Sequence, residues 1–155
     1  MGQSTNGQIC FGNAYEEDFE FPWDAEPWNG DHEDWWRAEC GYAPSKELFD
    51  GEGDYIDGIK PEQAVIDAYF KEQRDFDAAH PFPVSLVNYC SGDYPMWILA
   101  VPSSVLSNSR GEARAFRPAE LDVSDEEIAA LREFCIKYDL IPAEDATWYL
   151  TSYWG

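Results

Sequence analysis

Residues 84 to 101 read VSLVNYCSGDYPMWILAV, and this stretch is the most informative about the fold. Residues 84–90 are rich in β-forming side chains, residues 91–95 have the composition of a turn, and residues 96–101 are continuously apolar. A short apolar run bounded by prolines is typical of a central strand that is covered on both faces. The stretch therefore predicts two strands joined by a tight turn.

The elements on either side extend this hairpin to an α+β pattern. We expect strands at 8–15 and 147–154, a possible short strand at 114–117, and a helix at 61–79. A second helix begins at Ser124, where Glu127 completes a capping box, and its apolar face carries Ile128, Leu131, Phe134, Cys135 and Tyr138. The sequence predicts a single domain over residues 1–155, with a mainly antiparallel sheet of four to five strands and two main helices.

Size and composition place the chain among intracellular globular proteins. Its 155 residues are 45% hydrophobic, which is enough for one buried core. The longest apolar run has six residues, whereas a membrane-spanning helix needs about 20. The N-terminus lacks the basic and apolar regions of a signal peptide, and the four cysteines are widely separated. We therefore expect a cytoplasmic protein with reduced thiols.

The charge is strongly acidic. There are 31 acidic and 10 basic residues, so the formal net charge is −21. Such a field repels nucleic acid and anionic lipid, and it attracts cations or proteins with basic grooves. The composition argues against direct nucleic-acid binding and against a membrane-surface protein.

Much of this acid lies in residues 16–39, which hold ten acidic residues, one arginine and four tryptophans. Pro22, Pro27 and Gly30 interrupt any long helix there. We therefore expect an irregular, tryptophan-rich acidic arm at residues 16–39, with one helical turn around Asp31 to Ala38. Its Trp rings pack on the domain and its carboxylates lie in water.

A Ca²⁺-binding loop is an alternative interpretation of the next acidic stretch. Its carboxylates alternate in the manner of a Ca²⁺ loop: Asp50, Glu52, Asp54 and then Asp57. Tyr55 stands where that loop needs glycine, and Pro61 stands where it needs a chelating Glu. The sequence therefore predicts no metal and no cofactor, and these four residues stay as an alternative metal site.

No catalytic motif is apparent. The chain has no nucleophile elbow, phosphate loop, dinucleotide fingerprint or zinc spacing, and a Cys90 nucleophile would need His32 or His80 as its partner. Arg110, Arg114 and Arg117 form the only basic cluster, for which pairing with the chain's own carboxylates is favoured over phosphate binding. The sequence favours a protein that is not an enzyme.

Three stretches carry a resemblance. They are the opening Met1-Gly2-x-Ser4-Thr5-x-Gly7, the run from Cys90 to Trp97, and Leu131-Arg132-Glu133-Phe134-Cys135 ahead of Ser152-Tyr153-Trp154. Together they resemble small acidic proteins encoded by bacteriophages and mobile elements. The resemblance implies a phage protein in the host cytoplasm, and it supplies no catalytic residue.

The resemblance and the charge together favour an inhibitor that imitates nucleic acid and blocks a host defence protein with a basic nucleic-acid-binding groove. The carboxylates expected at the contact are Glu16, Glu17, Asp18, Glu20, Asp24, Asp31, Glu33 and Asp34. Trp28, Trp35 and Trp36 are the expected hot spots, meaning residues that carry most of the binding energy. The alternatives are a divalent-metal-binding protein or metal-dependent enzyme, and a structural or assembly protein of the virion.

Overall fold

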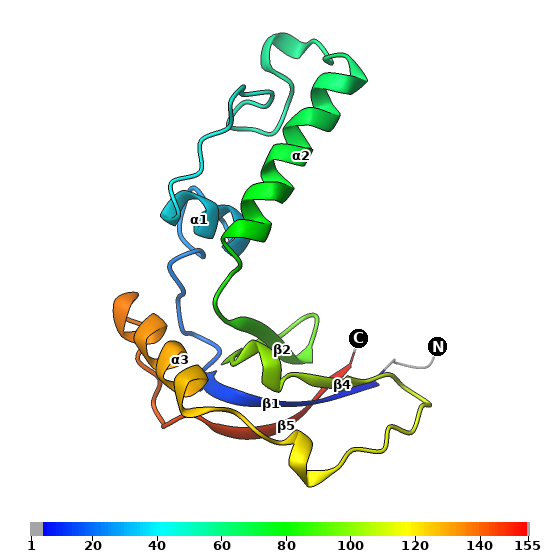
Figure 1. The fold of residues 1–155 in the computed structure, drawn as a ribbon, viewed down its shortest axis with the longest axis vertical. Coiled ribbons are helices and arrows are strands. Elements are labelled where there is room, and N and C mark those ends of the chain that lie inside the picture. Colours follow the sequence, from blue (N-terminus) through cyan, green and yellow to red (C-terminus); the bar gives the residue numbers. More distant parts are fainter. Residues whose placement is uncertain (1–4, 155) are drawn as a thin grey trace. The chain divides into compact units, whose positions relative to one another are not determined.

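A computed structural model describes residues 5–154 of the chain, so Met1, Gly2 and Ser4 of the opening stretch lie outside the described residues. The chain forms two compact units (Figure 1). We call residues 1–21 and 83–155 the sheet unit, and Pro22–Phe82 the helical unit. The prediction of a single domain concerns how these units fold together, and it stays a prediction.

The sheet unit contains five strands and one α-helix. The strands are β1 (Thr5–Tyr15), β2 (Ser85–Ser91), β3 (Pro95–Ala100), β4 (Leu106–Asn108) and β5 (Thr147–Trp154). Their order is β3-β2-β5-β1-β4, and β3 also pairs with β1. Short 3-10 turns lie at Pro102–Ser104 and Pro118–Glu120. The α+β class is confirmed, and the strand after β3 is β4 rather than the one expected at 114–117.

The sheet is mixed, which corrects the prediction of a mainly antiparallel sheet. β1 runs antiparallel to β3, β4 and β5, and β2 runs antiparallel to β3. The ends of β2 and β5 pair in parallel, with Cys90 opposite Tyr153. Two strands joined by a tight turn run antiparallel. β2 and β5 are far apart in the chain, so no turn sets their relative direction.

β3 is covered on both faces, as its apolar sequence predicts. Ile98 and Leu99 are fully buried although adjacent side chains of a strand point to opposite faces. β1 lies very close to β3 at Gly12. A Cβ atom at this position would collide with the backbone carbonyl of Leu99. The core of the sheet unit therefore surrounds β3.

Helix α3 (Asp125–Lys137) confirms the prediction of a capped helix after Ser124. The Ser124 side chain accepts a hydrogen bond from the Glu127 backbone N–H, and Leu131, Phe134 and Cys135 are buried. Next to it, the Tyr15 hydroxyl donates to the Leu140 carbonyl at 2.9 Å. The helix is thus fixed to the end of β1.

The helical unit contains α1 (His32–Glu39) and α2 (Gln63–Ala79), with a 3-10 turn at Ile56–Gly58. The helix expected at 61–79 is confirmed as α2, and α1 brings the number of α-helices among the described residues to three. No helix in the described part of the chain is long and apolar enough to cross a membrane.

The irregular acidic arm predicted at residues 16–39 is not supported. Residues 16–21 belong to the sheet unit and residues 22–39 to the helical unit. Trp23 and Trp35 are 3% and 5% exposed, and their ring centroids lie 5.1 Å apart. Burial of these indole rings gives residues 22–39 an ordered core, which the Pro and Gly residues of the segment do not prevent.

Candidate protein-binding surface

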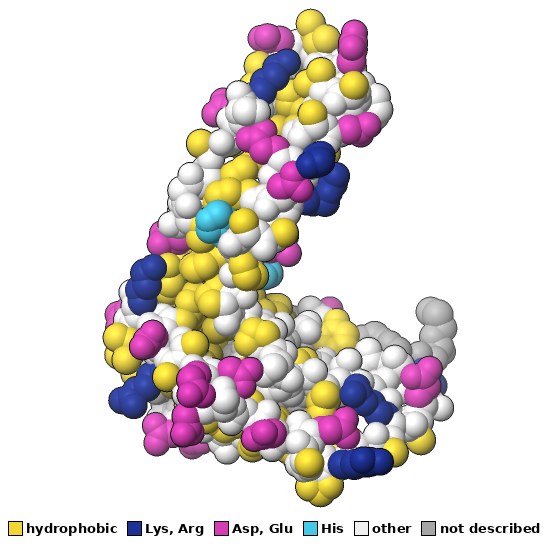
Figure 2. Space-filling view, viewed as in Figure 1, with side chains coloured by type: hydrophobic (Ala, Val, Ile, Leu, Met, Phe, Trp, Pro, Cys, Tyr) yellow, Lys and Arg dark blue, Asp and Glu magenta, His cyan; other side chains and the backbone are white. Residues whose placement is uncertain are grey.

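The helical unit concentrates the acidic charge. Sixteen acidic and five basic residues fall within Pro22–Phe82, which gives this unit a formal charge of −11. The larger sheet unit holds the other fifteen acidic and five basic residues. Figure 2 shows Asp and Glu side chains along the visible face of the helical unit, with apolar side chains between them. The helical unit is therefore the candidate for a surface that binds cationic groups.

Part of this acidity has a structural role in α1. Asp31 precedes the helix, and its Oδ1 accepts a hydrogen bond of 2.9 Å from the backbone N–H of Asp34. Glu33 and Asp34 follow in the first turn, where the helix dipole favours negative charge. These three predicted contact residues therefore also stabilise the start of α1, and all three are exposed.

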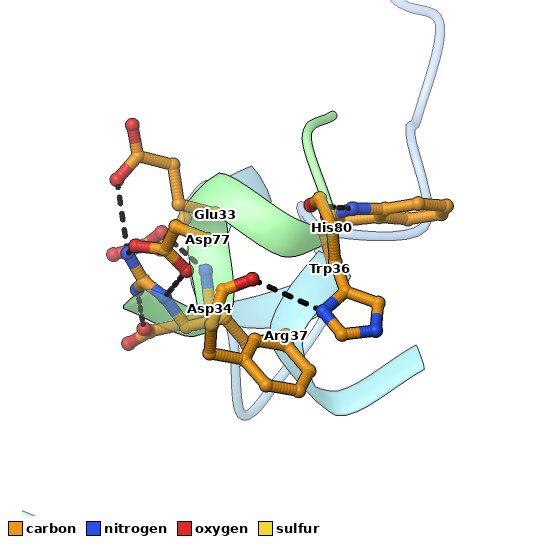
Figure 3. A network of polar contacts seen from close by, with 8 residues as sticks. Glu33, Asp34, Trp36, Arg37, Asp77 and His80 are labelled. Atoms are coloured by element: carbon orange, nitrogen blue, oxygen red, sulfur yellow. Dashed lines mark hydrogen bonds and ion pairs between the residues drawn. The ribbon is translucent and has the colours of Figure 1, made fainter. Parts of the chain in front are cut away.

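Arg37 ties α1 to α2 through a carboxylate network (Figure 3). Its Nε and Nη2 atoms each donate to the Asp77 carboxylate at 2.8 Å, and Nη1 and Nη2 also donate to Asp34 and Glu33. The hydrogen bonds to Asp77, and then those to Asp34, raise the pKa of Arg37 above its usual value. The Arg37 side chain is only 14% exposed, whereas those of Glu33 and Asp34 are 66% and 54% exposed. The network thus fixes the helices while two of its carboxylates stay accessible.

The three predicted hot-spot tryptophans differ in accessibility. Trp35 lies in the aromatic core of the helical unit, against Trp23 and Phe82. Trp36 is half-buried, and its Nε1 donates to the His80 carbonyl at 2.9 Å (Figure 3). Trp28 is also half-buried. Trp28 and Trp36 therefore present part of their rings to solvent, and Trp35 supports the core.

The first predicted carboxylates directly follow β1 in the sheet unit. Tyr15, Phe19 and Phe21 pack on one another, with ring centroids 4.6 to 5.1 Å apart. The acidic residues between these rings are exposed to solvent; they are Glu16, Glu17, Asp18 and Glu20. Their side chains form no hydrogen bond or ion pair within residues 5–154. Asp24, Asp31, Glu33 and Asp34 belong to the helical unit instead, so the predicted contact residues are divided between the two units.

The alternative metal site is not assembled. The Asp50 Oδ1 atom accepts hydrogen bonds from the backbone N–H groups of Glu52 and Asp54, at 2.9 and 3.0 Å, and so stabilises a turn. Among the described residues, no group of three or more His, Cys, Asp or Glu side chains could hold a metal ion. Glu52, Asp54 and Asp57 are exposed, and within the described chain their side chains have no hydrogen-bond or ion-pair partner. Sequence reasoning treated these residues only as metal ligands, whereas the structure adds them to the acidic surface.

The two histidines are engaged in aromatic contacts within the helical unit. The His80 ring stacks on Phe76 at 4.1 Å, and the His32 ring lies 5.1 Å from that of Phe82. In the sheet unit, Arg114 donates to the Ser107 carbonyl. Neither Arg114 nor Arg117 forms an ion pair with a carboxylate of the described residues, although the sequence favours such pairing.

No protein-family model, curated protein or solved structure matches the chain.

Proposed function

We propose that the chain is a non-enzymatic interaction protein whose acidic helical unit binds a partner protein with a basic, nucleic-acid-binding groove. The observation that supports this most directly is the exposure of Glu52, Asp54 and Asp57 on a unit of formal charge −11, since their carboxylates have no hydrogen-bond or ion-pair partner among residues 5–154. The resemblance to acidic phage proteins supports a phage setting, in which the partner is a host defence protein and the chain is its inhibitor.

The chemistry of the partner follows from that of the carboxylates. A carboxylate accepts charge-assisted hydrogen bonds from the same Lys and Arg groups that hold phosphates. The helical unit presents these groups on a framework fixed by the Arg37–Asp77 pair and by the buried Trp23 and Trp35 rings. The field of these carboxylates accelerates the encounter with a basic surface.

The test is a capture experiment on the DNA-binding fraction of a bacterial lysate. We expect the immobilised chain to retain basic-groove proteins that duplex DNA elutes. The variant Glu52→Gln, Asp54→Asn, Asp57→Asn should retain clearly less, because it removes three exposed charges from the helical unit. Asn suits the positive φ of 63° at position 57.

The matched control changes charge equally in the sheet unit, through Asp93→Asn, Glu112→Gln and Asp122→Asn, which are all exposed. This variant should retain the same proteins as the unchanged chain. Equal loss in both variants would reduce the effect to net charge alone. Capture that duplex DNA does not reverse contradicts the proposal.

A further inference from the structure

A groove of about 320 Å³ lies along the first half of α2 in the helical unit. Residues 45–48 form one wall, and the N-terminal half of α2 forms the other. The groove is lined by the apolar groups of Leu48, Ala64, Val65, Ala68 and Tyr69, and by the polar side chains of Ser45, Lys46 and Glu72. The volume is at the lower end of the range for ligand pockets, which is about 300–1,000 Å³.

Small side chains on α2 create this groove. Ala64 and Ala68 are four residues apart, so they lie one above the other on the same helix face. Both are exposed, and neither extends far enough from the helix to fill the space beside Leu48, which is buried. The result is an apolar helix face that the described chain leaves open.

Contacts made by the lining residues hold the walls of the groove in place. The Ser45 backbone N–H and hydroxyl both donate to the Glu72 carboxylate, at 2.8 and 2.5 Å, which attaches residue 45 to α2. Beyond Leu48, the Phe49 ring stacks on Tyr55 at 5.1 Å and meets the Tyr69 ring edge-on at 5.6 Å. The groove is therefore formed before any partner arrives.

We propose that this groove takes an apolar side chain from a lysine- or arginine-rich segment of the partner protein, a step that rests on the function proposed above. The charge of −11 on this unit favours cationic segments. At the groove itself, Lys46 is outnumbered by Glu72 in the lining and by the neighbouring Glu47, which is exposed with no side-chain partner in the described chain. An apolar anchor inside a polar rim is the common arrangement of protein interfaces. The carboxylates supply attraction, and the groove supplies selectivity for a basic segment with a properly placed apolar residue.

The test uses two fluorescein-labelled peptides of equal charge. In one, leucines alternate with pairs of lysines, and in the other serine replaces each leucine. We expect the leucine peptide to bind about tenfold or more tightly by fluorescence anisotropy, because burial of one leucine side chain contributes at least that factor. Equal affinities for the two peptides overturn the proposal, and so does a lack of binding by both.

Variants of the groove complete the experiment. Ala68→Trp fills the space from an exposed position and should lower the affinity for the leucine peptide to that of the serine peptide. Ala78→Trp is the matched control, since Ala78 is exposed on the same helix outside the groove, and it should leave both affinities unchanged. Ala64→Trp replaces Ala68→Trp if the melting temperature shows that the latter does not fold. Full affinity in a folded groove variant overturns the proposal.

The two proposals fail in different ways. If the peptides bind equally and the Glu52, Asp54 and Asp57 substitutions weaken both, the groove has no role while the acidic surface retains its own. If the groove variants remove the leucine preference but capture of DNA-binding proteins is not reversed by DNA, the groove stands and nucleic-acid mimicry fails.

Discussion

Cys10 is fully buried in the sheet unit, and burial raises the pKa of its thiol to about 11 from an ordinary value of about 9. Its neighbours in the core are Val87, Ile98 and Ala100. Below pH 9 both the folded and the unfolded chain keep the proton. Between about pH 9 and pH 11 only the unfolded chain releases it, so the stability that the neutral thiol provides is lost as pH rises.

We expect the melting temperature in the presence of a reductant to fall as pH rises above about 9. Cys10→Ala should be less stable at neutral pH, because it leaves a cavity, and its melting temperature should depend less on pH. Thermal denaturation followed by circular dichroism at several pH values checks this. An unchanged pH dependence in Cys10→Ala would show that other groups cause the alkaline loss.

At the scale of elements, the Arg37 guanidinium links α1 to α2 through the Asp77 carboxylate. Arg37→Met removes the bidentate contact and leaves Asp77 without its partner, and we expect a loss of about 1–3 kcal/mol in the free energy of unfolding. Lys71→Met is the matched control on α2, because both side chains of the Lys71–Asp75 ion pair are exposed to solvent. It should cost at most about 0.5 kcal/mol. Chemical denaturation measures both, and similar losses would contradict the distinction.

Helix α3 provides a second comparison within one element. Leu131 is 2% exposed, so Leu131→Ala should cost about 2–5 kcal/mol through lost burial and a new cavity. Ser124→Ala should cost about 1 kcal/mol, because it removes only the N-cap acceptor. Urea denaturation gives both values. A neutral Leu131→Ala would mean that the helix does not pack as described.

The elements that local sequence specifies were predictable. The capping box at Ser124 and the apolar spacing that follows place α3, and the Val84–Val101 stretch places β2 and β3. The parallel pairing of Cys90 with Tyr153 depends on strands far apart in the chain, so no local pattern could predict it. The sequence indicates that Trp rings of residues 16–39 pack on the domain, but it does not show that Trp35, which is also expected as a hot spot, is one of the buried rings. The helical turn expected around Asp31 to Ala38 corresponds to α1, and Asp31, three residues before Asp34, caps its start.

At the scale of the molecule, the proposed function predicts that binding depends on salt. Raising the salt concentration from about 50 to 200 mM should slow association with the partner, since it screens the attractive field. Four acidic residues follow β1: Glu16, Glu17, Asp18 and Glu20. Replacing them with Gln or Asn should lower the association rate with little change in melting temperature, because their side chains form no hydrogen bond or ion pair within the described part of the chain. Stopped-flow kinetics with a captured partner tests this, and a rate insensitive to both changes contradicts electrostatic steering.

The contact between Trp23 and Phe82 has a consequence for how the chain is assembled. These rings lie 5.9 Å apart, and they stand at the beginning and the end of the helical unit. The unit therefore leaves the sheet unit and returns to it through neighbouring positions, as an insertion between β1 and β2. An inserted segment whose two ends lie close together can be exchanged with little loss of stability in the domain that carries it, because a short linker can join the two ends of that domain. The inserted segment can then be replaced while the sheet that carries it is retained.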